Sequence, residues 1–194
     1  MNMQAFHLIE PVHSADHLLG PQGAAVTVVE YGDFECPHCK QAAGAVKLLF
    51  ARFEHRVRFA FRHFPLEEVH PHSLRAAEVA ECAGAQGKFW QMHDLLFEKQ
   101  SHLELTHLQA YARSLDLDMG RFTAELDDGI YLQRVREHQR SGNASGVRAT
   151  PGFFVNGRIQ DVSYGLGALF GAVEAELAAS AGKLTSASEQ RICL

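Results

Sequence analysis

Hydrophobic and polar residues follow two different periods along this chain, and the changes of period divide it into segments. Val26–Tyr31 is apolar and rich in β-branched residues, which predicts a buried central strand. Residues 42–53 place their apolar side chains at the spacing of one helix face. Residues 57–62 alternate between large apolar side chains and arginine or alanine, which predicts a second strand. The order strand, helix, strand predicts two parallel strands joined by a crossover helix.

A block of helical periodicity follows, from about His72 to Gly142. Beyond it, Phe153–Asn156 and Arg158–Val162 flank the dipeptide Asn156-Gly157, which is typical of a two-residue hairpin turn. The alanine-rich stretch Leu166–Ser180 predicts a closing helix. The chain is therefore expected to form an α/β core with an all-helical insertion. The predicted helices of the insertion are Ser73–Ala85, Lys88–Lys99, Thr106–Ser114, Met119–Leu126 and Ile130–Ser141.

These patterns predict four segments in a chain of 194 residues, which is long enough to bury a sizeable core. Residues 24–65 and 148–181 are expected to form the α/β core, and residues 66–147 the inserted helical domain. Residues 1–23 are expected to be an N-terminal extension, and residues 182–194 a flexible tail.

Charge and hydropathy exclude several classes of function. The net charge is −5 and lysine and arginine form no run, so nucleic acid is not an expected partner. No stretch approaches the roughly 18 apolar residues of a membrane span. Residues 1–20 hold several charged residues and histidines and lack the continuous apolar core of a secretory signal. We therefore expect a cytoplasmic location, or a periplasmic one if a leader precedes this sequence.

The sequence Cys36-Pro37-His38-Cys39 carries the most informative chemistry, because two thiols at this spacing can close a small, reversible disulfide. The pair lies between a predicted strand and a predicted helix, so Cys36 is expected at a helix N-terminus. There, free backbone N–H groups and the positive end of the helix dipole favour a thiolate. Pro37 suits the first helical position. We expect His38 to stabilise the Cys36 anion further.

Two other interpretations of the cysteine pair are weaker. A structural zinc site needs four ligands, and neither a second pair of cysteines nor a histidine pair at suitable spacing is present. A purely structural disulfide is disfavoured because so short a loop constrains the unfolded chain little. We therefore expect no metal, and redox chemistry at this pair.

From about Val26 to about Ala179, the chain resembles the DsbA-like branch of the thioredoxin superfamily. The resemblance implies an α/β, thioredoxin-like fold with an all-helical insertion. It is carried by Cys36-Pro37-His38-Cys39, by the preceding Val29–Glu35, by His63–Leu66, by Gln86–Trp90 and by Ala149–Gly157.

The resemblance also implies roles for residues outside the cysteine motif. Thr150-Pro151 matches the cis-proline loop of this superfamily, which lies opposite the disulfide and holds an extended substrate segment through backbone hydrogen bonds. Glu30 matches an acidic residue beneath the disulfide, where burial raises the carboxyl pKa and lets it exchange a proton with Cys39. The competing interpretation is that Glu30 forms an ion pair with Arg58 or Arg62 of the next strand.

The resemblance implies a protein dithiol–disulfide oxidoreductase whose only redox group is the Cys36–Cys39 pair, with no separate cofactor. Its expected partners are protein or peptide thiols and disulfides, with glutathione as a further candidate, and a recycling redox partner. The direction of electron flow stays open, because the same residues serve oxidation and reduction.

Two alternative functions stay open. A glutathione-dependent transferase or isomerase of the related kappa-like branch usually has serine in place of Cys36. A non-catalytic redox-sensing module would use the pair only to switch an interface. Of the other thiols, Cys82 is expected to be a buried helix residue, and Cys193 an exposed thiol near the C-terminus.

Overall fold

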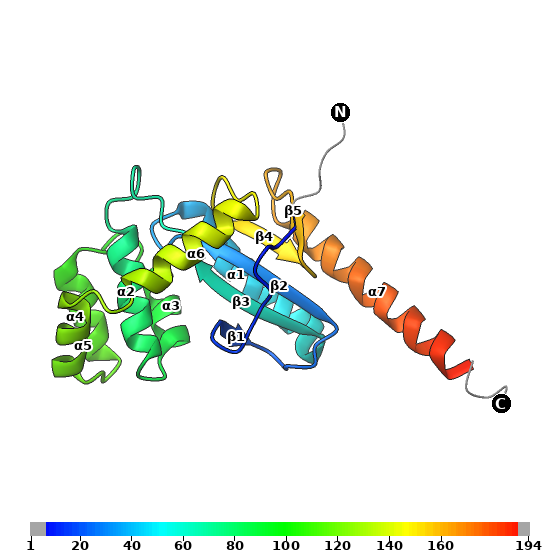
Figure 1. The fold of residues 1–194 in the computed structure, drawn as a ribbon, viewed down its shortest axis with the longest axis horizontal. Helices are drawn as coiled ribbons and strands as arrows, with labels where there is room; N and C mark the ends of the chain where they lie inside the picture. Colours follow the sequence, from blue (N-terminus) through cyan, green and yellow to red (C-terminus); the bar gives the residue numbers. More distant parts are fainter. Residues whose placement is uncertain (1–6, 190–194) are drawn as a thin grey trace.

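A mixed sheet organises residues 7–189, the part of the chain that the computed structural model describes, with side chains up to residue 182 (Figure 1). Within this part the sheet has five strands in the order β1-β3-β2-β4-β5. Strands β2 and β3 are parallel, and the other neighbouring pairs are antiparallel. The predicted crossover unit is thereby confirmed. The strands are β1 (His17–Leu19), β2 (Val26–Gly32), β3 (Val57–His63), β4 (Gly152–Val155) and β5 (Arg158–Gln160).

The two faces of the sheet are covered by different parts of the chain. On one face, helix α1 (Pro37–Phe53) and helix α7 (Gly167–Glu189) contribute buried side chains to the main core. On the other face lies a smaller apolar cluster, which the N-terminal segment and the end of helix α6 (Leu132–Ala144) cover. Gly142 allows this close approach of α6, because a Cβ atom there would lie 2.7 Å from the Phe64 ring.

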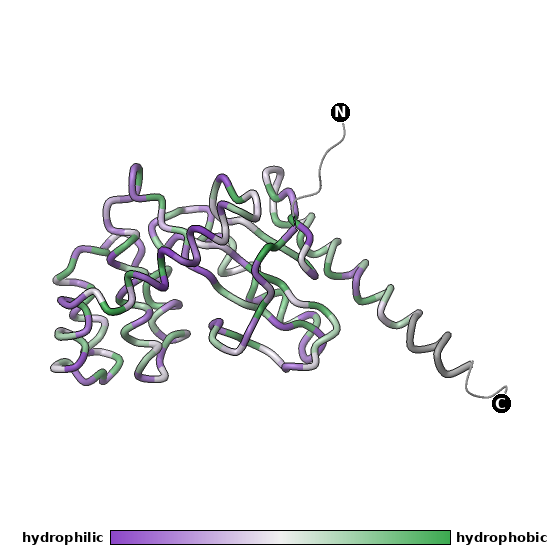
Figure 2. Tube along the Cα trace, in the orientation of Figure 1, coloured by the Kyte–Doolittle hydropathy of each residue, from purple (hydrophilic) through white to green (hydrophobic). Residues whose placement is uncertain are grey.

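The helical insertion lies beside the sheet, at the left of Figure 1, and α6 runs from it back across the core. Hydrophobic and hydrophilic residues alternate along its helices (Figure 2), as expected for helices that bury one face. All the predicted helices of this block are present, with ends that differ by at most three residues. Besides α6 they are α2 (Ser73–Gly84), α3 (Phe89–Glu98), α4 (Leu105–Ser114) and α5 (Met119–Asp127).

The structure corrects the expected ends of the chain. The residues expected to form only an N-terminal extension include β1, which pairs with β3 at one edge of the sheet. The expected tail from residue 182 is helical as far as Glu189, because α7 continues through alanine and serine residues without a proline to stop it. Its second half extends away from the body (Figure 1). Cys193 lies outside the described residues.

A buried ion pair fixes the N-terminal segment to the sheet. Arg62 on β3 donates to both carboxylate oxygens of Asp16, at 2.9 and 3.0 Å, and both side chains have no exposed surface. Arg62 also donates to the backbone oxygens of Glu10 and Pro11 and to the Tyr31 hydroxyl. Every polar group of this pair is thus satisfied, as burial of a charge requires.

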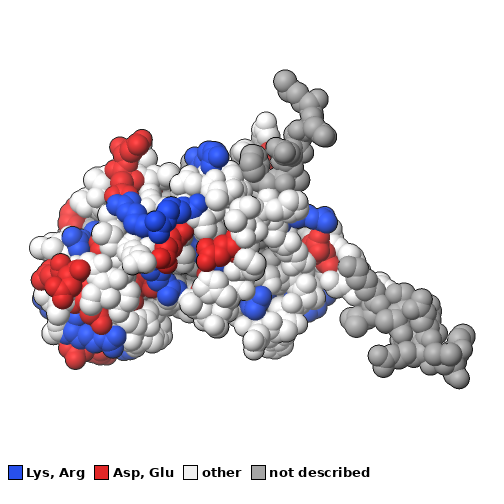
Figure 3. Space-filling view, viewed as in Figure 1, with Lys and Arg blue, Asp and Glu red and all other residues white. Residues whose placement is uncertain are grey.

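None of the described helices has the length and apolarity needed to cross a bilayer. On the face seen in Figure 3, acidic and basic side chains are interspersed rather than separated into patches of one sign.

Candidate redox site

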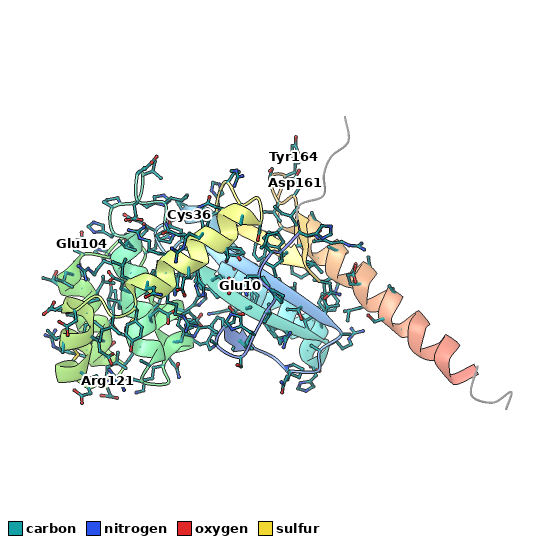
Figure 4. All side chains as sticks on the ribbon, viewed as in Figure 1. Glu10, Cys36, Glu104, Arg121, Asp161 and Tyr164 are labelled. Carbon is teal, nitrogen blue, oxygen red and sulfur yellow. The ribbon has the colours of Figure 1, made fainter. Side chains whose placement is uncertain are left out.

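Cys36 and Cys39 lie at the start of α1, where the chain leaves the central strand β2. Cys36 is the N-cap residue of the helix and Pro37 occupies its first turn, as predicted. The Cys36 carbonyl accepts hydrogen bonds from the backbone N–H groups of Cys39 and Lys40, at 3.1 and 3.2 Å. Figure 4 shows Cys36 in the region where the helical insertion meets the core. Both thiols are free, and Cys36 retains only 4% of its surface exposed.

The surroundings of Cys36 stabilise its thiolate. A hydrogen bond from the Cys39 side chain is the largest influence, and it lowers the pKa of Cys36 to about 4 against the opposing effect of burial. The Thr150 side chain and the backbone N–H groups of Cys39 and His38 lower this pKa further. The first amides of α1 therefore act on the sulfur, as expected from the position of Cys36 at the helix N-terminus.

Cys39 has the opposite character. It is fully buried, and burial raises its pKa well above the usual range of a thiol. The hydrogen bond to Cys36 and the nearby Glu30 raise the pKa further. One thiol of the pair is thus ionised at neutral pH, and the other keeps its proton.

The loop before β4 faces the first cysteine. The Thr150–Pro151 peptide bond is cis, which confirms the expectation from the sequence. The Cys36 sulfur lies 3.4 Å from the Thr150 carbonyl oxygen. The Thr150 hydroxyl is buried and has no hydrogen-bond partner among the described residues, so its proton is available to the sulfur.

Glu30 lies on β2 beneath the cysteine pair and is 1% exposed. Burial, and then the charge of Cys36, raise the pKa of the Glu30 carboxyl to about 8. Its Oε1 atom has no hydrogen-bond partner among the described residues. At neutral pH this carboxyl therefore holds a proton next to the two sulfurs.

The expected alternative, an ion pair of Glu30 with Arg58 or Arg62, is wrong. Glu30 lies opposite Phe61 in the parallel register, so its side chain shares a face with the odd-numbered residues of β3. Arg62 instead contacts Asp16, and Arg58 donates to the Thr27 hydroxyl.

The His38 imidazole is exposed and lines an open groove of about 450 Å³ next to Pro151. Of His38, the backbone N–H is the group that lowers the pKa of Cys36. The stabilising role of the imidazole therefore stays a prediction. The groove is also lined by Gln41, Ala149, Thr150 and, from the segment before α7, Val162, Ser163, Gly165 and Leu166.

Asp33 is a site residue that sequence reasoning missed. Its backbone N–H lies 3.4 Å from the Cys39 sulfur, and its buried carboxylate accepts from the Leu66 backbone N–H and from His70 Nδ1, each at 2.8 Å. It thereby fixes the loop before Cys36 to the segment after β3. An acidic residue at the junction between strand and motif was the only available signal.

Among the described residues, neither Cys82 nor the histidines form a second redox or metal centre. Cys82 is fully buried in α2, and burial raises its pKa to about 12. His17, His63 and Glu81 bring three ligand atoms within 4.8 Å of one another. However, both imidazoles hydrogen-bond to one oxygen of Glu81, and Arg134 Nε lies 3.0 Å from that same oxygen. A permanently charged guanidinium at that distance disfavours a metal ion.

A sheet of this topology, a reactive dithiol at the start of α1 and a cis-proline facing it together define a thioredoxin-fold dithiol protein with a DsbA-like helical insertion. A family model described as thioredoxin matches residues 13–175, and the chain belongs to this family.

Three solved structures share this fold. The oxidised form of BdbD from Bacillus subtilis has a TM-score of 0.78, with 24% identity over 89% of this chain and 98% of that one. Alpha-DsbA1 from Wolbachia pipientis has a TM-score of 0.75, with 21% identity over 91% of this chain and 98% of that one. A thioredoxin-like oxidoreductase from Silicibacter pomeroyi has a TM-score of 0.67, with 26% identity over 74% of this chain and 82% of that one.

A different kind of relative is the Na(+)/H(+) antiporter NhaA 1 of Salinispora arenicola, which is 49% identical over 163 residues. The match covers 84% of this chain and 25% of the antiporter. The chain thus spans about a quarter of the length of this curated relative.

Proposed function

We propose that the chain is a thiol–disulfide oxidoreductase that exchanges the Cys36–Cys39 pair with protein or peptide thiols and disulfides. The observation that carries this proposal is the contrast between the two thiols. The pKa of Cys36 is lowered to about 4, and that of the adjacent Cys39 is raised well above the usual range. The oxidoreductase from Silicibacter pomeroyi, with the same fold, supports the proposal.

In the reducing direction, the Cys36 thiolate attacks one sulfur of a substrate disulfide and expels the other as a thiolate. The mixed disulfide removes the negative charge from Cys36, so the pKa of Glu30 falls and its ionised form can accept the Cys39 proton. The Cys39 thiolate then attacks Cys36. This closes the Cys36–Cys39 disulfide and releases the second substrate thiolate.

In the oxidising direction the same steps run in reverse. A substrate thiolate attacks the Cys36 sulfur of the disulfide, and Cys39 leaves as a thiolate. Glu30 then supplies the proton that Cys39 takes up. The second substrate thiolate attacks the mixed disulfide, so two electrons pass to the protein. A stabilised Cys36 thiolate favours the reduced protein, which makes its disulfide the more oxidising.

The groove beside Pro151 supports an extended substrate. The Thr150 backbone lies next to the Cys36 sulfur, where it can pair with a peptide segment in strand-like fashion. Glutathione fits the same chemistry as a small thiol, and a recycling redox partner must restore the starting state. The cytoplasmic location is part of this proposal, and cell fractionation would test it.

A second candidate is a redox-sensing module that acts with a membrane transporter. The supporting observation is the match to a quarter of an Na(+)/H(+) antiporter, whose sequence therefore combines a region like this one with a larger remainder. In this role the dithiol would change state once and alter a contact, without turning over substrate.

Insulin reduction and oxidation of a model dithiol peptide test the proposal. We would use a Cys193→Ser background and compare Cys36→Ser, Cys39→Ser and the control Cys82→Ala. An oxidoreductase turns over many times, loses activity in Cys36→Ser and accumulates a mixed disulfide in Cys39→Ser, while Cys82→Ala stays active. A single stoichiometric reaction would favour the sensor. Glutathione conjugation that survives Cys39→Ser would favour the kappa-like alternative.

A further inference from the structure

The side-chain amide of Gln100 connects the helical insertion to the loop that carries Cys36. Gln100 follows α3 and is partly buried. Its Nε2 atom donates to the Phe34 carbonyl oxygen at 2.8 Å and to the Cys36 carbonyl oxygen at 2.9 Å. An amide group has two N–H donors, so both are used on this loop.

These two carbonyls flank the peptide segment that leads into α1. The Cys36 carbonyl is also the acceptor for the backbone N–H groups of Cys39 and Lys40 in the first turn of the helix. Gln100 therefore fixes the carbonyl around which that turn is built. The direction of the amides that face the Cys36 sulfur depends on the same turn.

The end of α3 contacts this region at further points. The Phe34 ring packs against Phe97, with ring centroids 5.0 Å apart, and Lys40 Nζ donates to the Glu98 carbonyl at 3.3 Å. These contacts hold α3 and α1 together without Gln100. Loss of the Gln100 amide should therefore alter the geometry of the loop more than it alters the fold.

We propose that Gln100 is a positioning residue through which the helical insertion holds the redox loop in the geometry that stabilises the Cys36 thiolate. The proposal rests on the proposed oxidoreductase function and adds to it that the insertion helps to set how oxidising the disulfide is. Gln100 acts through the loop backbone, because both of its hydrogen bonds go to carbonyl oxygens and not to the reacting sulfurs.

Two substitutions separate the possible effects of this amide. Gln100→Met keeps the length of the side chain and removes both donors. Gln100→Glu replaces the donors with carboxylate oxygens that face two carbonyl oxygens, so the loop must move or the new carboxyl must take a proton. The negative charge of the new carboxylate would also disfavour the Cys36 thiolate, so the pKa of Cys36 should rise more than in Gln100→Met.

Gln86 offers a matched control within the insertion. It is also partly buried, and its amide makes two hydrogen bonds to the backbone of Asp118, one donated at 3.4 Å and one accepted at 2.8 Å. Gln86→Met therefore removes both hydrogen bonds, and Gln86→Glu the donated one, at a different place in the insertion.

The experiment titrates the ultraviolet absorbance of the Cys36 thiolate and measures the equilibrium of each folded variant with a glutathione buffer. We expect a higher pKa of Cys36 in both Gln100 variants. We expect a fall of about threefold to tenfold in the equilibrium constant for reduction by glutathione in Gln100→Met, the size of one or two lost hydrogen bonds. The Gln86 variants should match the wild type. The shorter Gln100→Asn should shift both quantities in the same direction, which covers the case in which Gln100→Glu does not fold.

A wild-type pKa and equilibrium constant in folded Gln100→Met would overturn the proposal, as would equal shifts in the Gln86 variants. The oxidoreductase function fails separately, if the wild-type protein does not exchange with glutathione or peptide thiols. The thiolate titration still tests the Gln100 contact in that case, since it needs no partner.

Discussion

The Cys36 sulfur and the Thr150 carbonyl oxygen lie 3.4 Å apart, although 114 residues separate them along the chain. The whole helical insertion lies between these two residues, so the fold must return to β4 before the site is complete. The Thr150 hydroxyl is buried without another partner among the described residues. This juxtaposition makes Thr150 part of the environment that sets the acidity of Cys36.

Thr150→Val should raise the pKa of Cys36, because it removes a donor to the thiolate while keeping the shape of the side chain. We expect the equilibrium constant for reduction by glutathione to fall by about fivefold, the size of one hydrogen bond. Thr123→Val, at an exposed position on α5, is the control and should leave it unchanged. An unchanged equilibrium in Thr150→Val would show that its hydroxyl does not act on the sulfur.

Alkylation at mildly acidic pH should label Cys36 before Cys39 and Cys82. Of these three cysteines only Cys36 is ionised under these conditions, since burial raises the pKa of Cys82 and, together with Cys36, that of Cys39. Brief treatment of the native reduced protein with iodoacetamide, followed by mass mapping, measures the order. Labelling of Cys39 first would reverse the roles assigned to the two thiols.

Glu30→Gln should change the pH dependence of stability in the reduced protein. The pKa of Glu30 is raised from 4.5 to about 8, so this carboxyl makes the folded state less stable as the pH rises through that window. The pKa of Cys36 is lowered from 9.0 to about 4, so the thiol makes the folded state more stable as the pH rises. The two effects oppose each other between about pH 4.5 and 8, so the contributions of Glu30 and Cys36 to the free energy of unfolding largely cancel in the wild type.

In Glu30→Gln the thiol effect of this pair is left, while the buried histidines, whose pKa values are lowered, act as in the wild type. Relative to the wild type, the free energy of unfolding of this variant should rise with pH by at most about 1.4 kcal/mol per unit, the slope of one proton. Cys36→Ser is the matched opposite, and its stability should fall with pH relative to the wild type, because the Glu30 effect is left without that of the thiol. Urea unfolding of the reduced proteins at several pH values measures both slopes. Identical slopes in all three proteins would contradict the assigned pKa shifts.

Asp16→Asn should destabilise the protein by roughly 3–5 kcal/mol, because it leaves the buried Arg62 charge without its partner. Burial alone would raise the pKa of Asp16, but hydrogen bonds from Arg62 hold this pKa below its usual value. The stabilisation is therefore present above the ordinary carboxyl pKa and is lost as the pH falls through the lowered one.

Glu174→Gln is the control for this ion pair, because it breaks an exposed pair with Arg52. It should cost less than about 1 kcal/mol in urea unfolding at neutral pH. Equal losses in the Asp16 and Glu174 variants would mean that the buried pair does not anchor the N-terminal segment.

Local patterns in the sequence predicted most of the core. The β-branched residues of β2, the alternation in β3 and the Asn156-Gly157 turn each identify an element without any distant contact. The turn residues have φ angles of 46° and 80°, the left-handed conformation that this dipeptide adopts readily. The cysteine motif placed the reactive sulfur at a helix N-terminus for the same local reason.

Features that depend on long-range pairing could not be predicted in this way. Strand β1 has three residues and exists only through its register with β3. The face of the sheet on which Glu30 lies follows from the register of β2 relative to β3. In this register Arg62 lies on the opposite face, where it contacts Asp16. The contacts of Asp33 and Gln100 with the redox loop join segments whose sequences carry no mark of one another.

Ultraviolet titration of the Cys36 thiolate in the reduced Cys193→Ser protein, with Cys36→Ser as the blank, measures directly whether the fold makes this thiol acidic. We expect a transition near pH 4, because the Cys39 thiol, the Thr150 side chain and the first amides of α1 all act on this sulfur. A transition near 8.5, as for a free cysteine, would contradict it.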